Sequence, residues 1–229
     1  MASLHIRFLE AKCYEKKSLL GEAGELREKM VKMKRYLHEI RFILAVSIVM
    51  FLAIFILPFY SAEGYSILKH TTSHLGSQNS PNAWIMNTVF LLLGISCILE
   101  SWFHLKGYWV HKTLLTIFGT GLILVALFQH APIVESAPYN LLEDAIHSIF
   151  ATIVGASFSL LAFSAAYIEK TNRRRVLALG VGLVAIVLSM LMFSVADLAG
   201  FWQRIMFIIS FIWLIFFFEG MRDGGVYTN

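Results

Sequence analysis

The sequence predicts an all-α fold: a polytopic membrane protein built as a six-transmembrane-helix bundle with an N-terminal cytoplasmic amphipathic helix. Of the 229 residues, 58% are hydrophobic and 15% are charged, and the mean hydropathy is +0.69. A soluble domain of this size has too small an interior to enclose that much apolar side chain. The apolar residues also fall in blocks of about 20, the length of helix that crosses about 30 Å of hydrocarbon.

Six such blocks define the predicted organisation of the chain. We expect membrane spans at residues 42–60, 83–103, 113–130, 143–168, 176–196 and 203–219. The predicted parts are a cytoplasmic amphipathic helix over 1–41, a six-helix transmembrane domain over 42–219 and a cytoplasmic tail over 220–229.

The distribution of Lys and Arg sets the predicted orientation. Of the 19 such residues, only Lys69 and Arg204 fall on one side of the bundle. The others lie in the terminal segments and in the connections 104–112 and 169–175. Cytoplasmic loops carry this excess in membrane proteins, so we predict a multi-pass protein of the cell membrane with both termini cytoplasmic. The net charge of +4 follows from this orientation, and we expect no nucleic-acid partner.

An apolar seam runs along the segment before the first span. Leu26, Met30, Met33 and Leu37 alternate at spacings of four and three residues, a pattern typical of coiled coils. One interpretation is a homo-oligomer in which two copies pair along this seam. The other is a helix that extends the first span or lies on the membrane surface, where its lysines meet anionic lipids.

The connection between the first two spans contains the polar stretch YSILKHTTSHLGSQNSPNAW, residues 65–84. We expect a short interfacial helix over 65–75, with Tyr65, Leu68 and Leu75 toward the bundle. Ser80 followed by Pro81 is typical of a helix N-terminus and predicts that the second span starts there.

This connection is longer than a plain link between two helices needs to be. Long loops without secondary structure of their own are uncommon unless they have a function. We therefore interpret residues 65–82 as the roof of an outward-facing polar pocket, with a solvated connector as the alternative.

Ionisable residues gather at the same predicted end of the bundle. They are His70, His74, His130, Glu143, Asp144, His147, Asp197 and Arg204. Such groups are expensive at membrane depth and indicate a functional site by default. The favoured interpretation is a site that binds or senses a lipid-like or small anionic ligand, with membrane lipids as partners. The candidate ligand-binding residues are Ser73, His74, Gln78, Asn82, Asp144, His147, Asp197 and Arg204, with Arg204 holding the anion.

Three other interpretations remain open for this cluster. His70, His74, Asp144 and His147 form a set that zinc accepts, and this predicts a metal-assisted membrane hydrolase at the outer face. Metal-free catalysis would use Ser73 as nucleophile with a histidine base. In a purely structural interpretation, Asp144, Asp197 and Arg204 pair with one another and lock the loop in place. A transporter is disfavoured, because the span centres lack charge.

Three short elements carry a resemblance to a known family. They are YSILKHTTSHLGSQNSPNAWIMN after the first span, DAIHSIFA at the fourth, and the Gly-x-x-Gln-Arg element of residues 200–204 at the sixth. Over residues 42–219 the chain resembles the uncharacterised prokaryotic membrane proteins of the domain-of-unknown-function 998 family, which implies six spans and no established activity. A looser similarity is to membrane hydrolases of the alkaline-ceramidase and adiponectin-receptor type, which implies zinc held by His and Asp. Those enzymes have seven spans and a late HxxxH, whereas spans five and six here contain no histidine.

Overall fold

The computed structural model describes residues 27, 29, 41–134 and 136–224, and every element within these ranges is a helix. The chain divides into two units, residues 1–41 and 42–229. The predicted seam through Leu26, Met30, Met33 and Leu37 lies outside the described residues, so pairing between copies stays a prediction.

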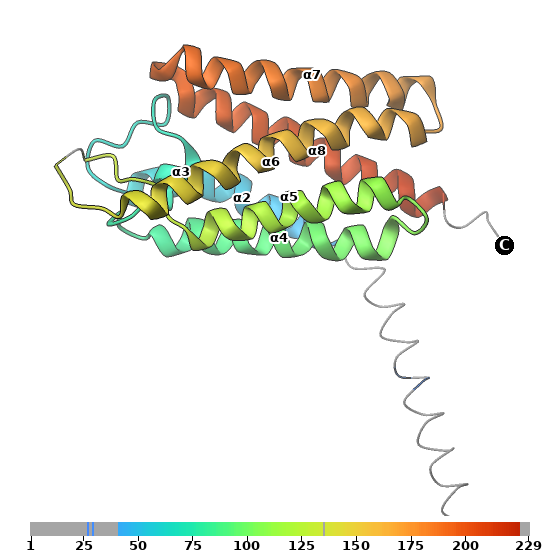
Figure 1. Ribbon diagram of the computed structural model, residues 1–229, viewed down its shortest axis with the longest axis horizontal. Coiled ribbons are helices and arrows are strands. Elements are labelled where there is room, and N and C mark those ends of the chain that lie inside the picture. The colour runs from blue at the N-terminus through green and yellow to red at the C-terminus, as the bar shows by residue number, and fades with distance from the viewer. Residues whose placement is uncertain (1–26, 28, 30–40, 135, 225–229) are drawn as a thin grey trace, which may run out of the picture. The chain divides into compact units, whose positions relative to one another are not determined.

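Six helices in the described residues are long and apolar enough to cross a membrane, which confirms the predicted class of fold. They are α2 (Phe42–Ile56) with the 3₁₀ turn η1 (Leu57–Tyr60), α4 (Ala83–His104), α5 (Trp109–Leu127), α6 (Leu141–Ile168), α7 (Asn172–Ser194), and α8 (Ala199–Gly224) after the 3₁₀ turn η2 (Ala196–Leu198) (Figure 1). Pro58 lies at the start of η1, where its ring ends the α-helical hydrogen bonding of α2.

The ends of several spans differ from the prediction. α5 begins at Trp109 rather than at residue 113, and it ends at Leu127 rather than at residue 130. α7 begins at Asn172 because the hydroxyl of Thr171 accepts the backbone N–H of Arg174 and caps the helix there. α8 runs on to Gly224, past the predicted end at residue 219.

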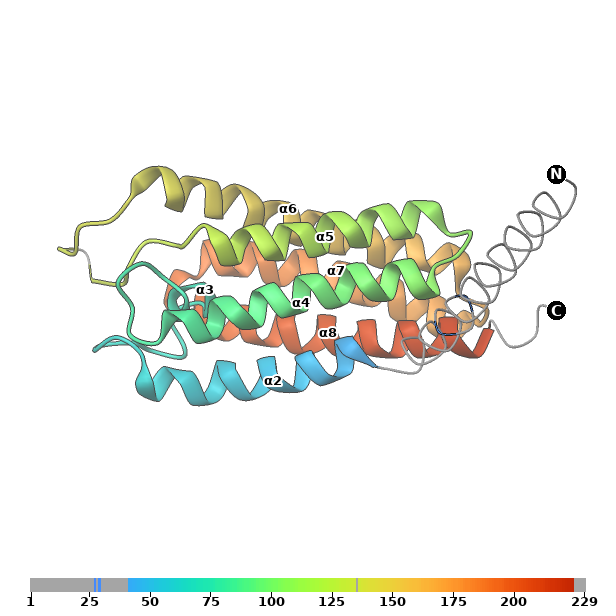
Figure 2. The same ribbon diagram turned by 90° about the horizontal axis from the view of Figure 1, so that it is seen from below.

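The six spans follow one another around the bundle. Each of α4, α5, α6 and α7 packs on the next helix along the chain, and α2 packs against both α4 and α8 (Figures 1 and 2). Aromatic side chains fill the middle. The ring of Phe118 lies 5.8 Å from that of Phe158 and 6.1 Å from that of Phe211, and Phe158 meets Trp213 edge to face. Tilted pairs of this kind add stability beyond the area that they bury.

One end of the bundle is held by a buried ion cluster. Glu100 is fully buried, and its carboxylate accepts two hydrogen bonds from Nη2 of Arg222, at 3.0 and 2.9 Å. His104 Nδ1 lies 2.9 Å from the same carboxylate, and the Arg222 Nε–H donates to His104 Nε2. The backbone N–H of Ile43 also donates to Glu100. The pairing offsets the cost of a buried charge and joins α2, α4 and α8 at this end.

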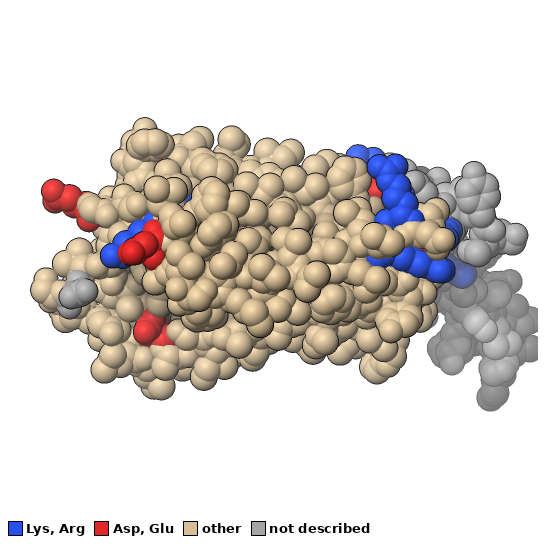
Figure 3. Space-filling model, turned by 90° about the horizontal axis from the view of Figure 1, so that it is seen from above, with Lys and Arg blue, Asp and Glu red and all other residues tan. Residues whose placement is uncertain are grey.

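Basic side chains concentrate at the same end. Figure 3 shows lysine and arginine gathered where α6 turns into α7, while the opposite end is mainly acidic. The opposite end carries α3 (Thr72–Leu75) and the connections 61–82 and 128–140, which together we call the cap. The prediction that the cap faces outward rests on this asymmetry.

Cysteine labelling tests this orientation. In a Cys13→Ser background, cysteines placed at Glu63 and Ser136 in the cap should react with a membrane-impermeant thiol reagent in intact cells. A cysteine at Asn172 should react only after lysis, because the excess of Lys and Arg places it inside. All three positions are exposed, and the native Cys97 is buried. Reaction of Asn172→Cys alone in intact cells would reverse the orientation.

Candidate functional site

The cap is anchored to the N-terminus of α8 by backbone hydrogen bonds. The first N–H groups of a helix have no partner within the helix. Here the N–H of Gly200 donates to the carbonyl of Lys69 at 3.2 Å, and that of Phe201 donates to Leu68 at 3.0 Å. A side chain at Gly200 would collide with the carbonyl oxygens of Ile67 and His70. Glycine is therefore required for the loop to reach the helix.

Arg204, one turn further along α8, also donates hydrogen bonds to this loop from its side chain. Its side chain is 3% exposed. Its acceptors are the carbonyl oxygens of Ile54, Ile67, His70 and Gly200 and the hydroxyl of Tyr65, at 2.8–3.2 Å. The structural interpretation is therefore right that Arg204 locks the loop, but its partners are backbone carbonyls rather than Asp144 and Asp197. A guanidinium committed to these acceptors has little capacity left for the predicted anion.

Tyr65 and Gln203 make further hydrogen bonds that hold the first loop. We call these contacts, together with those of Gly200, Phe201 and Arg204, the anchor. The Tyr65 hydroxyl donates to the carbonyls of His70 and Thr71, and burial raises the pKa of this phenol despite the opposing charge of Arg204. The side-chain oxygen of Gln203 accepts both the backbone N–H and the hydroxyl of Thr72, at 2.6 and 2.7 Å. Thr72 is fully buried, so these hydrogen bonds satisfy groups that water cannot reach.

The anchor explains why the predicted helix over 65–75 is wrong for most of its length. Only α3 is helical, because the carbonyls of residues 67–71 are directed to α8, Arg204 and Tyr65 rather than along a helix. Leu75 points into the core as predicted, whereas Leu68 is 53% exposed. α3 is held by a capping box, in which the Thr71 side chain meets the backbone of His74 and the His74 ring meets the backbone of Thr71.

The predicted start of the second span at residue 83 is confirmed, but Ser80 and Pro81 lie before the helix rather than at its N-cap and first turn. The helix begins at Ala83, and Asn82 before it has a left-handed backbone with φ of 58°. Asparagine tolerates this conformation better than most residues. Its side chain donates to the carbonyl of Tyr60 and so ties α4 to the end of α2. The predicted ligand residue Asn82 is therefore part of a turn.

The side chain of Gln78, another predicted ligand residue, instead hydrogen-bonds to the backbone of the α5–α6 connection. Its amide nitrogen donates to the carbonyls of Gln129 and Asn140, and its oxygen accepts the N–H of Asn140. Asn140 in turn caps α6 as predicted, accepting from the N–H groups of Leu142 and Glu143. The Glu143 side chain accepts the N–H of Gln129 rather than closing a capping box. The first loop and the connection to α6 are thus joined.

Two further residues that were predicted to bind the ligand, Asp197 and Ser73, make few contacts with other side chains in the described residues. The Asp197 side chain is 92% exposed, and its carboxylate lies 4.0 Å from the ammonium of Lys69, a surface pair of small energetic value. Ser73 is half-buried in α3, and its hydroxyl has no hydrogen-bond partner among the described residues.

Four imidazole rings from different parts of the chain lie in contact in the cap. The centroids of His70 and His74 are 5.4 Å apart, those of His74 and His130 are 4.7 Å apart, and those of His130 and His147 are 5.0 Å apart. The last two rings are stacked, with planes 10° apart. We call these four residues the histidine row. The sequence placed all four at one end, but its ligand sets omitted His130.

Each ring of the row is held through its Nδ1 atom. In the first loop, His70 Nδ1 accepts the N–H of Ser66 at 2.9 Å, and His74 Nδ1 accepts the N–H of Thr71 at 3.1 Å. In the buried part, His147 Nδ1 donates to the carbonyl of Phe128 at 2.8 Å. The protein scaffold thus fixes one nitrogen of each of these rings.

His130 is held by an acidic residue at the start of α6. Its Nδ1 donates to Oδ1 of Asp144, which also accepts the N–H of Ala131 at 2.8 Å. Asp144 therefore orients an imidazole and fixes the end of the α5–α6 connection. Its second carboxylate oxygen has no hydrogen-bond partner among the described residues.

The other nitrogen of each ring is available. Within the described part of the chain, no protein atom hydrogen-bonds to Nε2 of any member of the histidine row. None of these Nε2 atoms is among the fully buried side-chain atoms without a partner in the described residues, which are Ser47 Oγ, His111 Nε2 and Trp202 Nε1. The row therefore presents polar atoms that can contact a ligand.

The predicted zinc set finds no support in this arrangement. The described residues contain no group of three or more His, Cys, Asp or Glu side chains placed to hold a metal ion. In addition, His70 and His74 use the Nδ1 lone pair to accept backbone N–H groups, so the proton sits on Nε2. A protonated nitrogen cannot ligate zinc.

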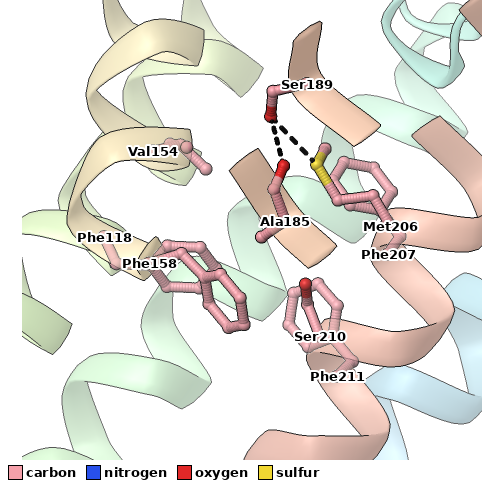
Figure 4. A pocket seen from close by; sticks show the side chains of 10 residues that line it. Phe118, Val154, Phe158, Ala185, Ser189, Met206, Phe207, Ser210 and Phe211 are labelled. Atoms are coloured by element: carbon pink, nitrogen blue, oxygen red, sulfur yellow. Dashed lines mark hydrogen bonds between the residues drawn. The ribbon is translucent and has the colours of Figure 1, made fainter. Parts of the chain in front are cut away.

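An apolar hollow lies near the middle of the membrane spans, between α5, α6, α7 and α8 (Figure 4). Phe118, Phe158, Phe207 and Phe211 form much of its wall, and a Cβ atom added at Gly155 would have no atom of another part of the chain within 4 Å. Ser189 donates to the carbonyl of Ala185. The Ser210 hydroxyl also borders the hollow and has no hydrogen-bond partner among the described residues. The wall of the hollow is therefore mainly apolar, with two serine hydroxyls at its border.

The anchor on α8 predicts a specific loss of stability. Arg204→Lys should lower the free energy of unfolding by roughly 2–4 kcal/mol, because an ammonium cannot replace the planar fork that reaches several buried carbonyls. The measurement is the melting temperature in detergent together with proteolysis at the first loop. Lys69→Gln is the matched control and should change little, because its ion pair is exposed. Equal effects of the two substitutions would rule out the anchor.

The pKa of His74 predicts loss of stability in acid. Burial, followed by the neighbouring imidazoles, lowers its pKa from an ordinary 6.5 to about 3. The unfolded chain then takes up more protons than the folded chain between these values. This contribution to stability is full above pH 6.5 and is lost as the pH falls toward 3. Burial, with the charge of Lys69, also lowers the pKa of His70.

The test compares the melting temperature of the wild type and His74→Asn between about pH 7.5 and about pH 4.5. The asparagine amide keeps an acceptor for Thr71 but does not titrate in this range. The wild type should lose more stability on acidification than the variant. Parallel curves would show that His74 is not responsible.

Comparison with known proteins gives a family. A family model described as a protein of unknown function (DUF998) matches residues 45–218, which include the anchor, the histidine row and nearly all of the six spans. No curated protein and no solved structure matches significantly. The match covers most of the chain and confirms the resemblance carried by the loop, the start of α6 and the Gly-x-x-Gln-Arg element. The chain belongs to the DUF998 family.

Proposed function

We propose that this protein binds a membrane lipid at the cap, with the headgroup against the histidine row, on the outer face of the cell membrane. The observation that carries the proposal is the set of four Nε2 atoms without a protein partner among the described residues. One nitrogen of each ring is enough to fix it in the fold. Four imidazoles in contact, each with its second nitrogen available, are more than the cap needs for stability.

The depth of the row favours a lipid over a soluble ligand. His147 lies in the second turn of α6, inside a span, whereas His70 lies in the loop outside the spans. A headgroup at the membrane boundary meets both. The hollow begins at Val154, seven residues further along α6 and therefore about 10 Å deeper. It offers an apolar surface to the hydrocarbon chain of the same ligand.

The proposed recognition rests on the imidazoles rather than on Arg204. The sequence predicts a lipid-like or small anionic ligand and gives Arg204 the role of holding its anionic group. Its guanidinium is buried and donates to protein acceptors, so it supports the loop that carries His70 and His74. Of the cations in the cap, Lys69 is exposed and lies beside Asp197.

A metal-assisted hydrolase is the second candidate, favoured by one observation. His130 and His147 donate Nδ1–H to a carboxylate and a backbone carbonyl, the second-shell arrangement that orients histidines toward a metal. Catalytic zinc sites have three protein ligands, so a further ligand would have to move into place. Metal analysis of protein purified without chelators decides this candidate, and a metal-free, fully folded protein would exclude it.

Lipid retention tests the leading proposal. His147→Asn keeps a donor for the Phe128 carbonyl but removes Nε2, and it should lower the amount of co-purifying lipid several-fold without a large change in melting temperature. The measurement is quantitative lipid mass spectrometry of the purified protein.

Thr72→Val is the control, because it weakens the cap through Gln203 without removing an imidazole. It should lower the melting temperature and leave the bound lipid nearly unchanged. If the lipid content follows melting temperature in both variants, the histidine row is a structural feature rather than a binding site.

A further inference from the structure

We infer that the headgroup bound at the histidine row is uncharged and rich in hydroxyl groups, of the sugar type. This inference rests on the proposed lipid binding and adds the chemical class of the headgroup. It follows from the protonation state that the Nδ1 partners impose on each ring, and from the charges that surround the row.

His70 and His74 present hydrogen-bond donors. A backbone N–H can only donate, so the Nδ1 atoms that face Ser66 and Thr71 must carry lone pairs. The proton of each neutral ring is then on Nε2. The loop side of the row therefore offers two N–H groups to a ligand.

His147 and His130 present acceptors when they are neutral. A backbone carbonyl can only accept, so the His147 Nδ1 that faces Phe128 carries the proton and its Nε2 carries a lone pair. The same reasoning applies to His130, whose Nδ1 faces the carboxylate of Asp144. In chain order the row thus offers two donors followed by two acceptors.

This order selects among lipid headgroups. A phosphate oxygen only accepts hydrogen bonds and an ammonium group only donates them, so each would satisfy half of the row. A hydroxyl group does both, and a sugar carries several hydroxyls on one rigid ring. The second oxygen of Asp144, which has no partner among the described residues, provides one more acceptor for a hydroxyl.

The charges around the row point to the same class. Asp144 is in direct contact with the row, and an ionised carboxylate there repels a phosphate. The guanidinium of Arg204 is directed to backbone carbonyls and Tyr65, and the ammonium of Lys69 lies beside the carboxylate of Asp197. Neither cation is committed to the row, so a neutral headgroup is preferred over an anionic one.

The experiment offers the full-length protein three lipids with identical acyl chains, each in phosphatidylcholine nanodiscs. They are a glucosyl diacylglycerol, phosphatidic acid and unmodified diacylglycerol. Retention is measured by native mass spectrometry after release from the nanodisc. The wild type should retain the glucosyl lipid roughly tenfold more than either of the others, which corresponds to one or two additional hydrogen bonds.

Matched variants locate the binding. In His74→Asn and His147→Asn the amide lies where Nδ1 was, so the scaffold hydrogen bonds persist while Nε2 is lost. Each should lower retention of the glucosyl lipid several-fold. His74→Gln and His147→Gln place an amide near the Nε2 position and should recover part of the retention. Melting temperatures confirm that each variant is folded.

The outcomes separate the two proposals. Preferential retention of phosphatidic acid, reduced by the Asn variants, would overturn the sugar-type headgroup and leave lipid binding at the cap in place. Equal retention of all three lipids with no effect of any cap variant would overturn both. Preference for the glucosyl lipid without sensitivity to the Asn variants would move the site away from the histidine row and also overturn the inference.

Discussion

The cap depends on the hydrogen bonds that the buried guanidinium of Arg204 donates to carbonyl oxygens of the first loop. The backbone N–H groups of Gly200 and Phe201 at the start of α8 donate to other carbonyls of the same loop. A charge at this depth is stable only because its hydrogen bonds are made by fixed oxygen atoms. The loop is therefore part of the folded bundle rather than a solvated connector.

Anchoring the loop places its histidines against those of the bundle. His70 and His74 are carried by the anchored segment, whereas His130 and His147 come from the α5–α6 connection and from α6. Gln78 joins the two parts through the backbone of Gln129 and Asn140. One rigid cap thus carries four rings, each with one nitrogen used by the scaffold and the other available to a ligand.

The candidate site was predictable in its location but not in its roles. Ionisable residues at span ends indicated which end of the bundle carries a site. The sequence assigned Arg204, Gln78 and Asn82 to a ligand, yet their side chains satisfy backbone groups of the cap. It also left His130 out of the ligand sets, because its contact with Asp144 joins residues 14 apart across an irregular connection. Backbone carbonyls are the same in every residue, so side-chain composition cannot reveal which of them need a partner.

The sequence by itself determined the six spans, the Pro58 break in α2, the Asn140 cap of α6 and the two chemically different ends. These features depend on local hydrophobicity, on the proline ring and on hydrogen bonds between residues close in the chain. Only the tertiary structure decided that the 65–75 segment is mostly non-helical, that Arg204 serves the loop, and which nitrogen of each histidine carries the proton. The reason is that each of these depends on a hydrogen-bond partner supplied by the folded backbone, often from a distant part of the chain.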